Sequence, residues 1–476
     1  MGTIWHPERI DGPGPKYKAV VTMIRNGIAN GGMTAGEKLP PVRELAWKLG
    51  VTPGTVARAY TMLTDSGMLQ AEVGRGTFVA LPPKKPDRNS PIEMDVIAHH
   101  VHQGTKNYPA DTYAVNMFSP HLPSAGQATL IRTLMAEVAQ NPASGVMHYP
   151  SRTGARPARE AVVKWLAGTP LGSFTEADVI LSHGGQNGLS LVFQSILQGR
   201  RPAIAIEALS YPGFRRAGEL LRADVVPIAM DKDGVIPEAL DEAARNHDVQ
   251  IFCTSPEVHN PTAGFTPVAR REALVEVARR HDIQIVEDDC YRMRVDRAPT
   301  YRMLAPERGW YVSSLAKTLT PALRIGFAIG PRQRTSDLRR VAEYNCFGLA
   351  TPLIDLCAKL LVHPDIDAIA EGTRQGFNAY VQSAVNILGG YDVAWRINVP
   401  FLWLSLPVGW RAGAFCQAAE GQGVQIRSAE EFVCRDARAP HAVRLAINAG
   451  VALHSFEDAI MRLRHLLDSP PEQLSV

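Results

Sequence analysis

Apolar residues in the first eighty positions recur at helical spacing over three short stretches. The second stretch ends at Gly50, and Thr52 and Pro53 provide the N-cap and the first-turn proline of the third. Two β-type runs around a glycine-rich turn follow, up to residue 80. Three helices and a β-hairpin in this order predict a winged helix-turn-helix over residues 1–80.

Beyond residue 80 the periodicity is lost, and proline and charged residues predict a linker over residues 81–112. From residue 113 onward, short apolar β-rich runs alternate with helical stretches, which is typical of an α/β fold with a mostly parallel sheet. More widely separated runs near the C-terminus predict a smaller α/β subdomain within the domain 113–476. The strands expected in the two parts lie at residues 179–182, 203–206, 250–254, 284–286 and 310–312, and at residues 401–406, 424–427 and 442–447.

Composition narrows the class of protein. A hydrophobic share of 45% and a charged share of 20% lie in the globular range. The net charge of +3 comes from residues 1–80, where nine Lys and Arg face six Asp and Glu, a mild indication of nucleic-acid binding. Six cysteines without a C-x-x-C pair suit reduced thiols in a cytoplasmic protein. A polar N-terminus and the lack of a long apolar run predict neither a signal peptide nor a membrane span.

Six residues of the N-terminal domain are candidates for contact with DNA. Four of them begin the third helix, where they would present hydroxyls, backbone amides and a guanidinium to the major groove. One arginine of the second helix and one of the wing are placed to neutralise phosphates or reach into a groove. A helical protein-interaction module with surface arginines is the alternative. The six residues are Thr52, Gly54, Thr55, Arg58, Arg43 and Arg75.

One lysine of the larger domain has the surroundings of a pyridoxal 5′-phosphate (PLP) site. Lys317 follows an apolar run and is flanked by hydroxyls. Ser314 before it and Arg324 seven residues after it could clamp a phosphate group. By itself this segment is equally compatible with an ordinary surface lysine and arginine.

An acidic cluster ends another apolar run, where ligands of α/β sheets gather. Asp288 of this cluster could pair with the protonated ring nitrogen of PLP, and Tyr291 could donate to its ring oxygen. A buried carboxylate without a partner is costly, so a cationic partner is expected. Taken alone, the cluster could also hold a magnesium ion.

Three further motifs fit a ring and a phosphate. Gly184, Gly185 and Gln186 follow a strand and open a helix, so backbone amides could approach a phosphate at its positive end. Tyr211 could stack on a pyridine ring, although a core tyrosine is the commoner interpretation of this residue alone. Asn260 offers an amide to the ring oxygen beside Tyr291.

Taken together, these motifs resemble two known families. Residues 16–80 resemble the GntR DNA-binding domain through Leu39-Pro-Pro-Val-Arg-Glu-Leu-Ala, Leu49-Gly-Val-Thr-Pro-Gly-Thr-Val and Gly74-Arg-Gly-Thr-Phe-Val. Residues 113–470 resemble the fold-type I aminotransferases through Tyr211-Pro-Gly, Asn260-Pro-Thr, Glu287-Asp-Asp-x-Tyr and Ser314-x-x-Lys. The two domains together resemble the MocR (GabR-like) regulators.

The resemblance assigns a role to each matching residue. It implies that Lys317 forms the internal aldimine and that Asp288 partners the ring nitrogen. Tyr291 and Asn260 would bond the ring hydroxyl, Tyr211 would stack on the ring, and Ser314, Arg324 and the loop from Gly184 to Gln186 would hold the phosphate. Arg444 matches the arginine that grips the α-carboxylate of a substrate.

The same resemblance implies a head-to-tail homodimer that binds a double-stranded DNA operator. A small amine or amino-acid effector would exchange with Lys317 and so control catabolic or biosynthetic genes. The alternatives are an active PLP-dependent aminotransferase with an appended DNA-binding module, and a plain repressor whose PLP is structural. No metal site is expected, because the histidines at 99, 100 and 102 lie in the polar linker.

Two departures from the family patterns affect these expectations. Relatives often carry an arginine beside the recognition-helix threonine, whereas this chain has Pro53. Fewer direct contacts to base edges are therefore expected, with more of the recognition left to DNA shape. Ala263 displaces the usual glycine of the asparagine motif by one position, which could reshape that turn.

Overall fold

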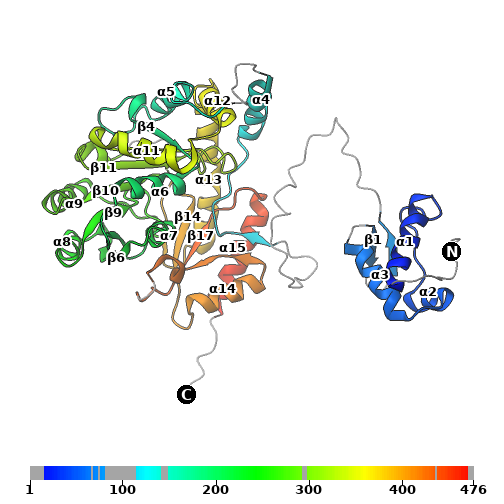
Figure 1. Ribbon diagram of the computed structural model, residues 1–476. Helices are drawn as coiled ribbons and strands as arrows, with labels where there is room; N and C mark the ends of the chain where they lie inside the picture. The colour runs from blue at the N-terminus through cyan, green and yellow to red at the C-terminus, as the bar shows by residue number, and fades with distance from the viewer. Residues whose placement is uncertain are drawn as a thin grey trace. The chain divides into compact units, whose positions relative to one another are not determined.

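The computed structural model describes residues 15–65, 68–72, 76–80, 114–140, 148–291, 297–434 and 437–469. The chain divides into two compact units at residues 101 and 102 (Figure 1). The linker expected at residues 81–112 lies outside the described residues, so the exact domain boundaries stay predictions.

The N-terminal unit has the predicted three helices and a hairpin. They are α1 (Lys16–Ala29), α2 (Val42–Leu49), α3 (Pro53–Asp65), β1 (Leu69–Glu72) and β2 (Gly76–Val79), and the two strands pair antiparallel. Gly50 ends α2 in the left-handed conformation, with φ of 66°. The apolar faces of the helices meet in one core built on Val20, Ile24, Leu45 and Leu63.

The larger unit is built on a sheet that is mostly parallel, as predicted. In the described part of the chain this sheet has seven strands in the order β4-β12-β11-β10-β9-β5-β6, and only β12 runs antiparallel to its neighbours. Its strands are β4 (Val179–Ser182), β5 (Ala203–Glu207), β6 (Asp224–Ile228), β9 (Val249–Thr254), β10 (Gln284–Asp288), β11 (Gly309–Ser314) and β12 (Gly326–Ile329).

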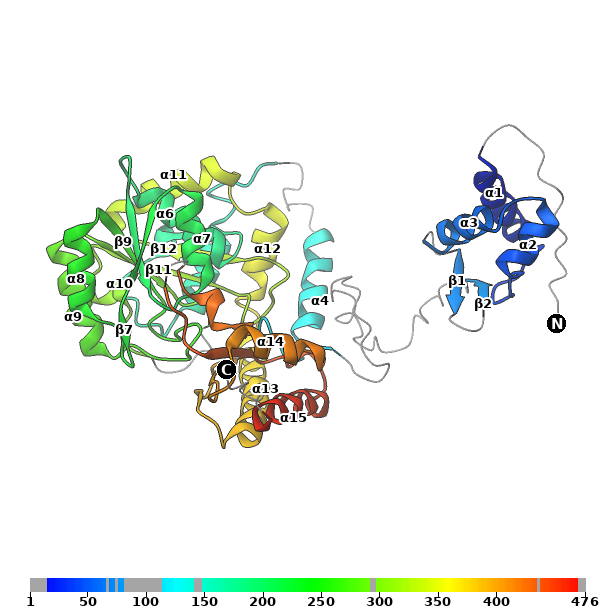
Figure 2. The same cartoon turned by 90° about the horizontal axis from the view of Figure 1, so that it is seen from below.

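Helices cover both faces of this sheet (Figures 1 and 2). Ile204 and Ile206 pack against α6, α7 and α11, whereas Ala203 and Ala205 pack against α8, α9 and α10. Burial on both faces explains why the strands are continuous apolar runs rather than alternating ones. The helices are α6 (Gly185–Ile196), α7 (Pro212–Leu220), α8 (Pro237–Asn246), α9 (Val268–Arg280), α10 (Tyr301–Leu304) and α11 (Thr335–Cys346).

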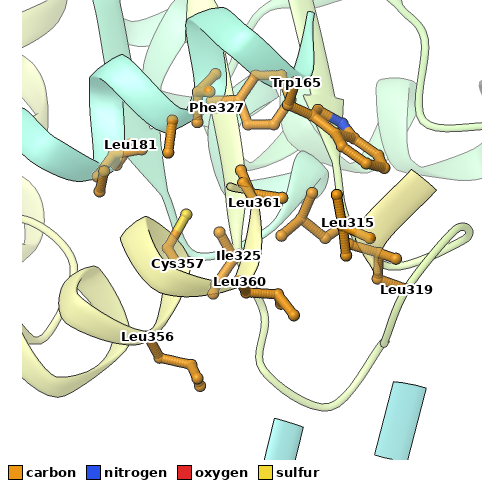
Figure 3. Packing of buried hydrophobic residues seen from close by; sticks show 14 of the residues in the cluster. Trp165, Leu181, Leu315, Leu319, Ile325, Phe327, Leu356, Cys357, Leu360 and Leu361 are labelled. Atoms are coloured by element: carbon orange, nitrogen blue, oxygen red, sulfur yellow. The ribbon is translucent and has the colours of Figure 1, made fainter. Parts of the chain in front are cut away.

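A second core lies beneath the segment that carries Lys317 (Figure 3). Leu315 and Leu319, on either side of the lysine, are buried in this cluster together with Trp165 and Phe327. The cluster also includes side chains of α4 (Gln127–Gln140), α5 (Arg156–Trp165) and α12 (Thr351–Leu360). Because its neighbours are fixed in a close-packed core, the backbone at Lys317 has little freedom to move.

The smaller C-terminal subdomain has a separate antiparallel sheet. Among the described residues its order is β13-β14-β17-β16, and α13, α14 and α15 pack in the same core. Its elements are α13 (Ile366–Leu388), β13 (Val393–Ala394), β14 (Phe401–Ser405), α14 (Ala412–Gly421), β16 (Arg427–Ser428), β17 (Ala442–Ala446) and α15 (Leu453–Asp468). The remaining short elements are β3 (Val115–Asn116), the pair β7 (Met230–Asp231) and β8 (Gly234–Val235), β15 (Val424–Gln425), and the 3-10 turns η2 (Glu176–Asp178), η3 (Arg332–Arg334) and η4 (Ala429–Phe432).

The strand predicted at residues 424–427 is wrong in extent. It consists of two strands that belong to different sheets, since β15 pairs with β3 while β16 pairs with β17. Val424 and Ile426 are both buried, so their alternation looked like one strand. The partner strand of each half comes from a distant part of the chain, and the local pattern does not reveal it.

Three structural findings bear on the class of protein. Among the described helices, none is long and apolar enough to cross a membrane. Within the described ranges, no group of three or more His, Cys, Asp or Glu side chains is arranged to hold a metal ion. Each of the six cysteines is present as a thiol.

Candidate functional site

A cavity of about 310 Å³ opens where the strands of the large sheet end and the C-terminal subdomain begins. Its volume is within the range of small-molecule sites. The residues that line it are Phe118, Ser119, Gly185, Gln186, Leu189, Tyr211, Pro212, Arg216, Asp288, Cys290, Tyr291, Ser314, Ala316, Lys317, Pro321, Arg324, Arg427, Phe432 and Arg444. Most of the residues singled out from the sequence therefore meet in one place.

Lys317 lies in this cavity with its amine 5.7 Å from the centre of the Tyr291 ring. Burial lowers the pKa of the amine to about 8, and the positive charge of Arg444 acts in the same direction. A lysine with such a pKa has a much larger neutral, nucleophilic fraction at pH 7 than an exposed lysine has.

Asp288 ends β10 and faces the cavity, while its acidic neighbours do not. Glu287 accepts a hydrogen bond from the Tyr301 backbone at 2.8 Å, and Asp289 accepts one from the Tyr311 hydroxyl at 2.8 Å. Removal from water raises the pKa of Asp288 to about 6. The backbone amide of Cys290 also donates to this carboxylate, at 3.1 Å. The carboxylate is therefore poorly compensated and suited to a cationic partner from a ligand.

The loop before α6 is shaped by glycine. Gly184 has φ of 84°, and a Cβ there would lie 2.7 Å from Nη2 of Arg324. At Gly185, which begins α6, a Cβ would lie 2.4 Å from Sγ of Cys290. Arg324 itself has a positive φ of 50°. This arrangement brings the helix N-terminus and a guanidinium together, which suits an anion.

Arg444, which is carried by β17, lines the cavity on the side of the C-terminal subdomain. Its Nη1 donates to Oδ1 of Asn260 at 2.7 Å, and its Nη2 donates to the carbonyl of Phe118. The Phe432 ring centre is 4.9 Å from the guanidinium carbon. Burial lowers the pKa of this guanidinium, and its Nε is buried without a hydrogen-bond partner. A buried donor of this kind favours an acidic ligand group.

Two of the expected residues do not line the cavity directly. Asn260 lies behind Arg444 and orients it, and Gly184 backs Arg324. The turn after Asn260 accommodates Ala263 in a conformation that usually favours glycine. This alanine adopts the left-handed conformation with φ of 60°, and its amide donates to the His259 carbonyl at 2.8 Å.

The N-terminal unit presents a second candidate surface. The Thr55 amide donates to the Thr52 hydroxyl at 3.3 Å, so Thr52 caps α3 as predicted. Gly54, like Arg43 on α2, is exposed. Arg58 is exposed too and stacks over the ring of Tyr17 at 4.3 Å, which restrains its orientation. Arg75 lies outside the described residues.

Both domains match models of known families. Residues 119–463 match the model of aminotransferase class I and II, and residues 16–79 match that of the gntR family of bacterial regulatory proteins. The chain belongs to the MocR group of GntR-type transcription regulators. DNA binding and transcription regulation follow from this membership.

Relatives of this MocR-type regulator share its domain order over most of their length. The HTH-type transcriptional regulator YdeF of Bacillus subtilis is 28% identical over 98% of this chain and 97% of its own. The vitamin B6 salvage pathway transcriptional repressor PtsJ of Salmonella typhimurium is 26% identical over 88% of this chain and 91% of its own. An archaeal alanine:glyoxylate aminotransferase aligns with a TM-score of 0.68 and 20% identity, covering 75% of this chain and 91% of its own, which shows the fold alone.

The regulator has the fold of PLP-dependent enzymes, and its cavity fits that cofactor. The glycine cradle at Gly184 and Gly185 leaves room that a Cβ would fill. Asp288 needs a cation, Lys317 offers an amine that loses its proton near pH 8, and Arg324 offers a positive charge beside the helix N-terminus. Each property matches one part of the cofactor, namely the ring nitrogen, the aldehyde and the phosphate.

Several residues of the cavity were not found from the sequence of the MocR-type regulator. Phe118, Arg216 and Arg427 line it without belonging to a recognised motif, and Cys290 lines it as the unassigned position of one. Cys290 lies inside the acidic motif that identified Asp288, so its closeness to Asp288 in the sequence could have indicated that it lines the cavity. Arg427 was placed in a predicted strand, and no spacing rule marks it as facing Arg444.

The lowered pKa of Lys317 predicts how the apoprotein takes up PLP. Only the neutral amine attacks an aldehyde, and the amine loses its proton as the pH rises through its pKa of about 8. The second-order rate of cofactor uptake should therefore rise as the pH approaches 8 and level off above it. Stopped-flow absorbance of apoprotein mixed with PLP between pH 6 and 10 measures this profile. A rate that kept rising to pH 10 would show an unshifted lysine.

Proposed function

We propose that this protein is a PLP-dependent transcription regulator that senses a small primary amine or amino acid and adjusts its binding to an operator. The observation that carries the proposal is that Lys317, Asp288 and Arg444 line one cavity of a chain that also carries a GntR domain. Lys317 offers an amine, Asp288 offers a negative charge for a cationic ring, and Arg444 offers a group that binds an acid.

The proposed roles follow from where each residue lies. Lys317 is the attachment point of the cofactor, and Asp288 holds the proton of the ring nitrogen. Tyr211 covers the ring and Tyr291 bonds the ring hydroxyl. Asn260, expected from the resemblance to bond that hydroxyl too, lies behind Arg444 and orients it. Ser314, Arg324 and the loop from Gly184 to Gln186 would hold the phosphate. Arg444 binds the carboxylate of the effector.

When bound, PLP supplies an aldehyde that reacts reversibly with primary amines. An amine effector would compete with Lys317 for it and would at the same time place its acid group on Arg444. The freed Lys317 amine and the newly neutralised Arg444 change the charge distribution of the cavity. We further propose that a head-to-tail homodimer transmits this change to the DNA-binding domains, because a ligand shifts an equilibrium only by its differential affinity for two states.

DNA contacts are proposed for the N-terminal turn of α3, with Thr52, Gly54 and Thr55 near the duplex and Arg58 one turn further on. Arg43 and Arg75 would contact phosphates or the adjacent groove. The stacking of Arg58 on Tyr17 supports this role because it orients the guanidinium before binding.

The test uses the full-length holoprotein and DNA selected from a random library. Primary amines that change the visible absorbance of the bound cofactor should also change the dissociation constant of the selected DNA. The Arg58→Ala variant should bind the same DNA at least about fivefold more weakly, as expected for loss of one base or phosphate contact worth about 1–3 kcal/mol. A dissociation constant for DNA that stays the same in the presence of every such amine would contradict the proposal.

The same cavity also favours a second function, catalysis of transamination, because the lysine, aspartate and arginine are all present. Sustained conversion of an amino acid and a 2-oxo acid into the exchanged pair would show an active aminotransferase. Absorbance changes without product formation would support the sensor.

A further inference from the structure

Two arginines of the C-terminal subdomain face each other across neighbouring strands. Arg427 on β16 is paired in register with Arg444 on β17, and both side chains line the cavity. Like charges directly opposite each other destabilise a sheet. Such a pair is favourable only if anionic groups compensate both charges.

The two guanidinium groups share one acceptor of the protein. Nε of Arg427 donates to the carbonyl of Phe118 at 2.9 Å, and Nη2 of Arg444 donates to the same oxygen. A neutral carbonyl cannot balance two positive charges. Arg427 also stacks over the Phe118 ring, with its guanidinium carbon 5.0 Å from the ring centre, so its position is well fixed.

The carboxylate that compensates Arg427 is Glu431, on the 3-10 turn η4. In this ion pair 33% of the arginine side chain and 38% of the glutamate side chain remain exposed to solvent. Solvent screens a pair that is about one-third exposed, which lowers its net contribution to stability. A carboxylate of a ligand could replace Glu431, because it would give Arg427 the same charge-assisted contact.

The charges along the cavity wall support an acidic ligand. Arg216, Arg324, Arg427, Arg444 and Lys317 line it, whereas Asp288 is the only carboxylate among the described lining residues. Arg324 lies beside the glycine cradle, and Arg444 suits one acid group. Arg216 and Arg427 then remain for a second acid group, and Arg427 is the one that lies in register with Arg444.

We propose that the effector is an amino dicarboxylate, whose second carboxylate displaces Glu431 from Arg427 while the first binds Arg444. This inference rests on the proposed function, since it names the ligand class of the same cavity. Glu431 acts as the stand-in anion of the ligand-free protein.

The test compares ligands of nearly equal shape that differ in one charge. Isothermal titration of the full-length holoprotein with L-glutamate and with L-glutamine gives the two dissociation constants. L-Glutamate should bind about tenfold or more tightly, the effect of one hydrogen-bonded charge pair. Equal affinity for the two amino acids would overturn the proposal.

Two variants separate this role from general damage to the fold. Arg427→Gln should abolish the preference for L-glutamate, so that the ratio of the two dissociation constants falls to about one. Glu431→Gln should move in the opposite direction and bind L-glutamate severalfold more tightly, because it removes the competing carboxylate. A preference that persists in Arg427→Gln, or weaker L-glutamate binding by Glu431→Gln, would contradict the inference.

Two readouts distinguish failure of this inference from failure of the proposed function. If the cofactor absorbance changes with none of the amines tested, the sensing proposal itself fails. If that absorbance responds equally to L-glutamate and L-glutamine, only the proposed binding of a second acid group by Arg427 is refuted. Glutarate, which lacks the amine, should raise the melting temperature of the apoprotein more than butyrate does, and equal shifts would also count against the role of Arg427.

Discussion

Replacing Lys317 by alanine is expected to abolish covalent attachment of PLP and, with it, every response of DNA binding to primary amines. The amine of Lys317 lies in the cavity with a pKa of about 8, so it is the group best suited to attack an aldehyde there. Alanine has no nucleophile, so the effect should be complete rather than partial.

The measurement is an absorbance scan of purified protein with added PLP, before and after borohydride, followed by mass spectrometry. Wild-type protein should retain the reduced cofactor on the peptide that contains Lys317. The matched control is Lys359→Ala, which removes an exposed lysine that is ion-paired with Glu137 on the neighbouring helix. Retention of a borohydride-fixed label by Lys317→Ala would place the attachment elsewhere.

Replacing Asp288 by asparagine is expected to weaken PLP binding by about 100-fold, on the order of 3 kcal/mol, because a partly buried charge pair loses its anion. The apoprotein should be no less stable at pH 7. The pKa of Asp288 is raised from 3.8 to about 6 in the folded protein, so its ionisation lowers stability progressively across this interval and in full above it. Equilibrium titration with PLP and thermal unfolding of the apoprotein measure the two effects.

The neighbouring residue provides the control. Asp289 accepts hydrogen bonds from Tyr311 and Arg297, and both it and the Arg297 side chain are almost fully buried. Asp289→Asn should therefore destabilise the fold by about 3 kcal/mol, since the buried Arg297 guanidinium then keeps only the more distant carboxylate of Glu257, at 4.0 Å, while PLP affinity changes little. Equal loss of PLP affinity in the two variants would contradict the assignment of Asp288.

Much of the candidate site was predictable from sequence because its residues lie in short local motifs. Lys317, Ser314 and Arg324 belong to one strand and the turn that follows it, so their spacing reflects their proximity. The glycines before α6 were predictable for the same reason, since a strand, a turn and a helix N-terminus follow directly in the chain.

The acidic run shows where the sequence pattern was insufficient without the resemblance. Three consecutive carboxylates end one strand, and successive side chains of a strand alternate between its two sides. Alternation alone allows Asp288 or the pair around it to face the cavity. The contacts of Glu287 with Tyr301 and of Asp289 with Tyr311 determine which one does.

By itself the sequence determined the order of the two domains, the winged helix-turn-helix and the mostly parallel sheet, and its motifs together pointed to the lysine of the candidate site. Each of these depends on periodicity or spacing within a few tens of residues, which the chain carries locally. The tertiary structure alone decided the division of residues 424–427 between two sheets and the opposition of Arg427 and Arg444. It also decided that Phe118 joins them, more than three hundred residues away in the chain. Pairings of this kind depend on which strands become neighbours, and that outcome is set by the packing of the whole domain rather than by any local pattern.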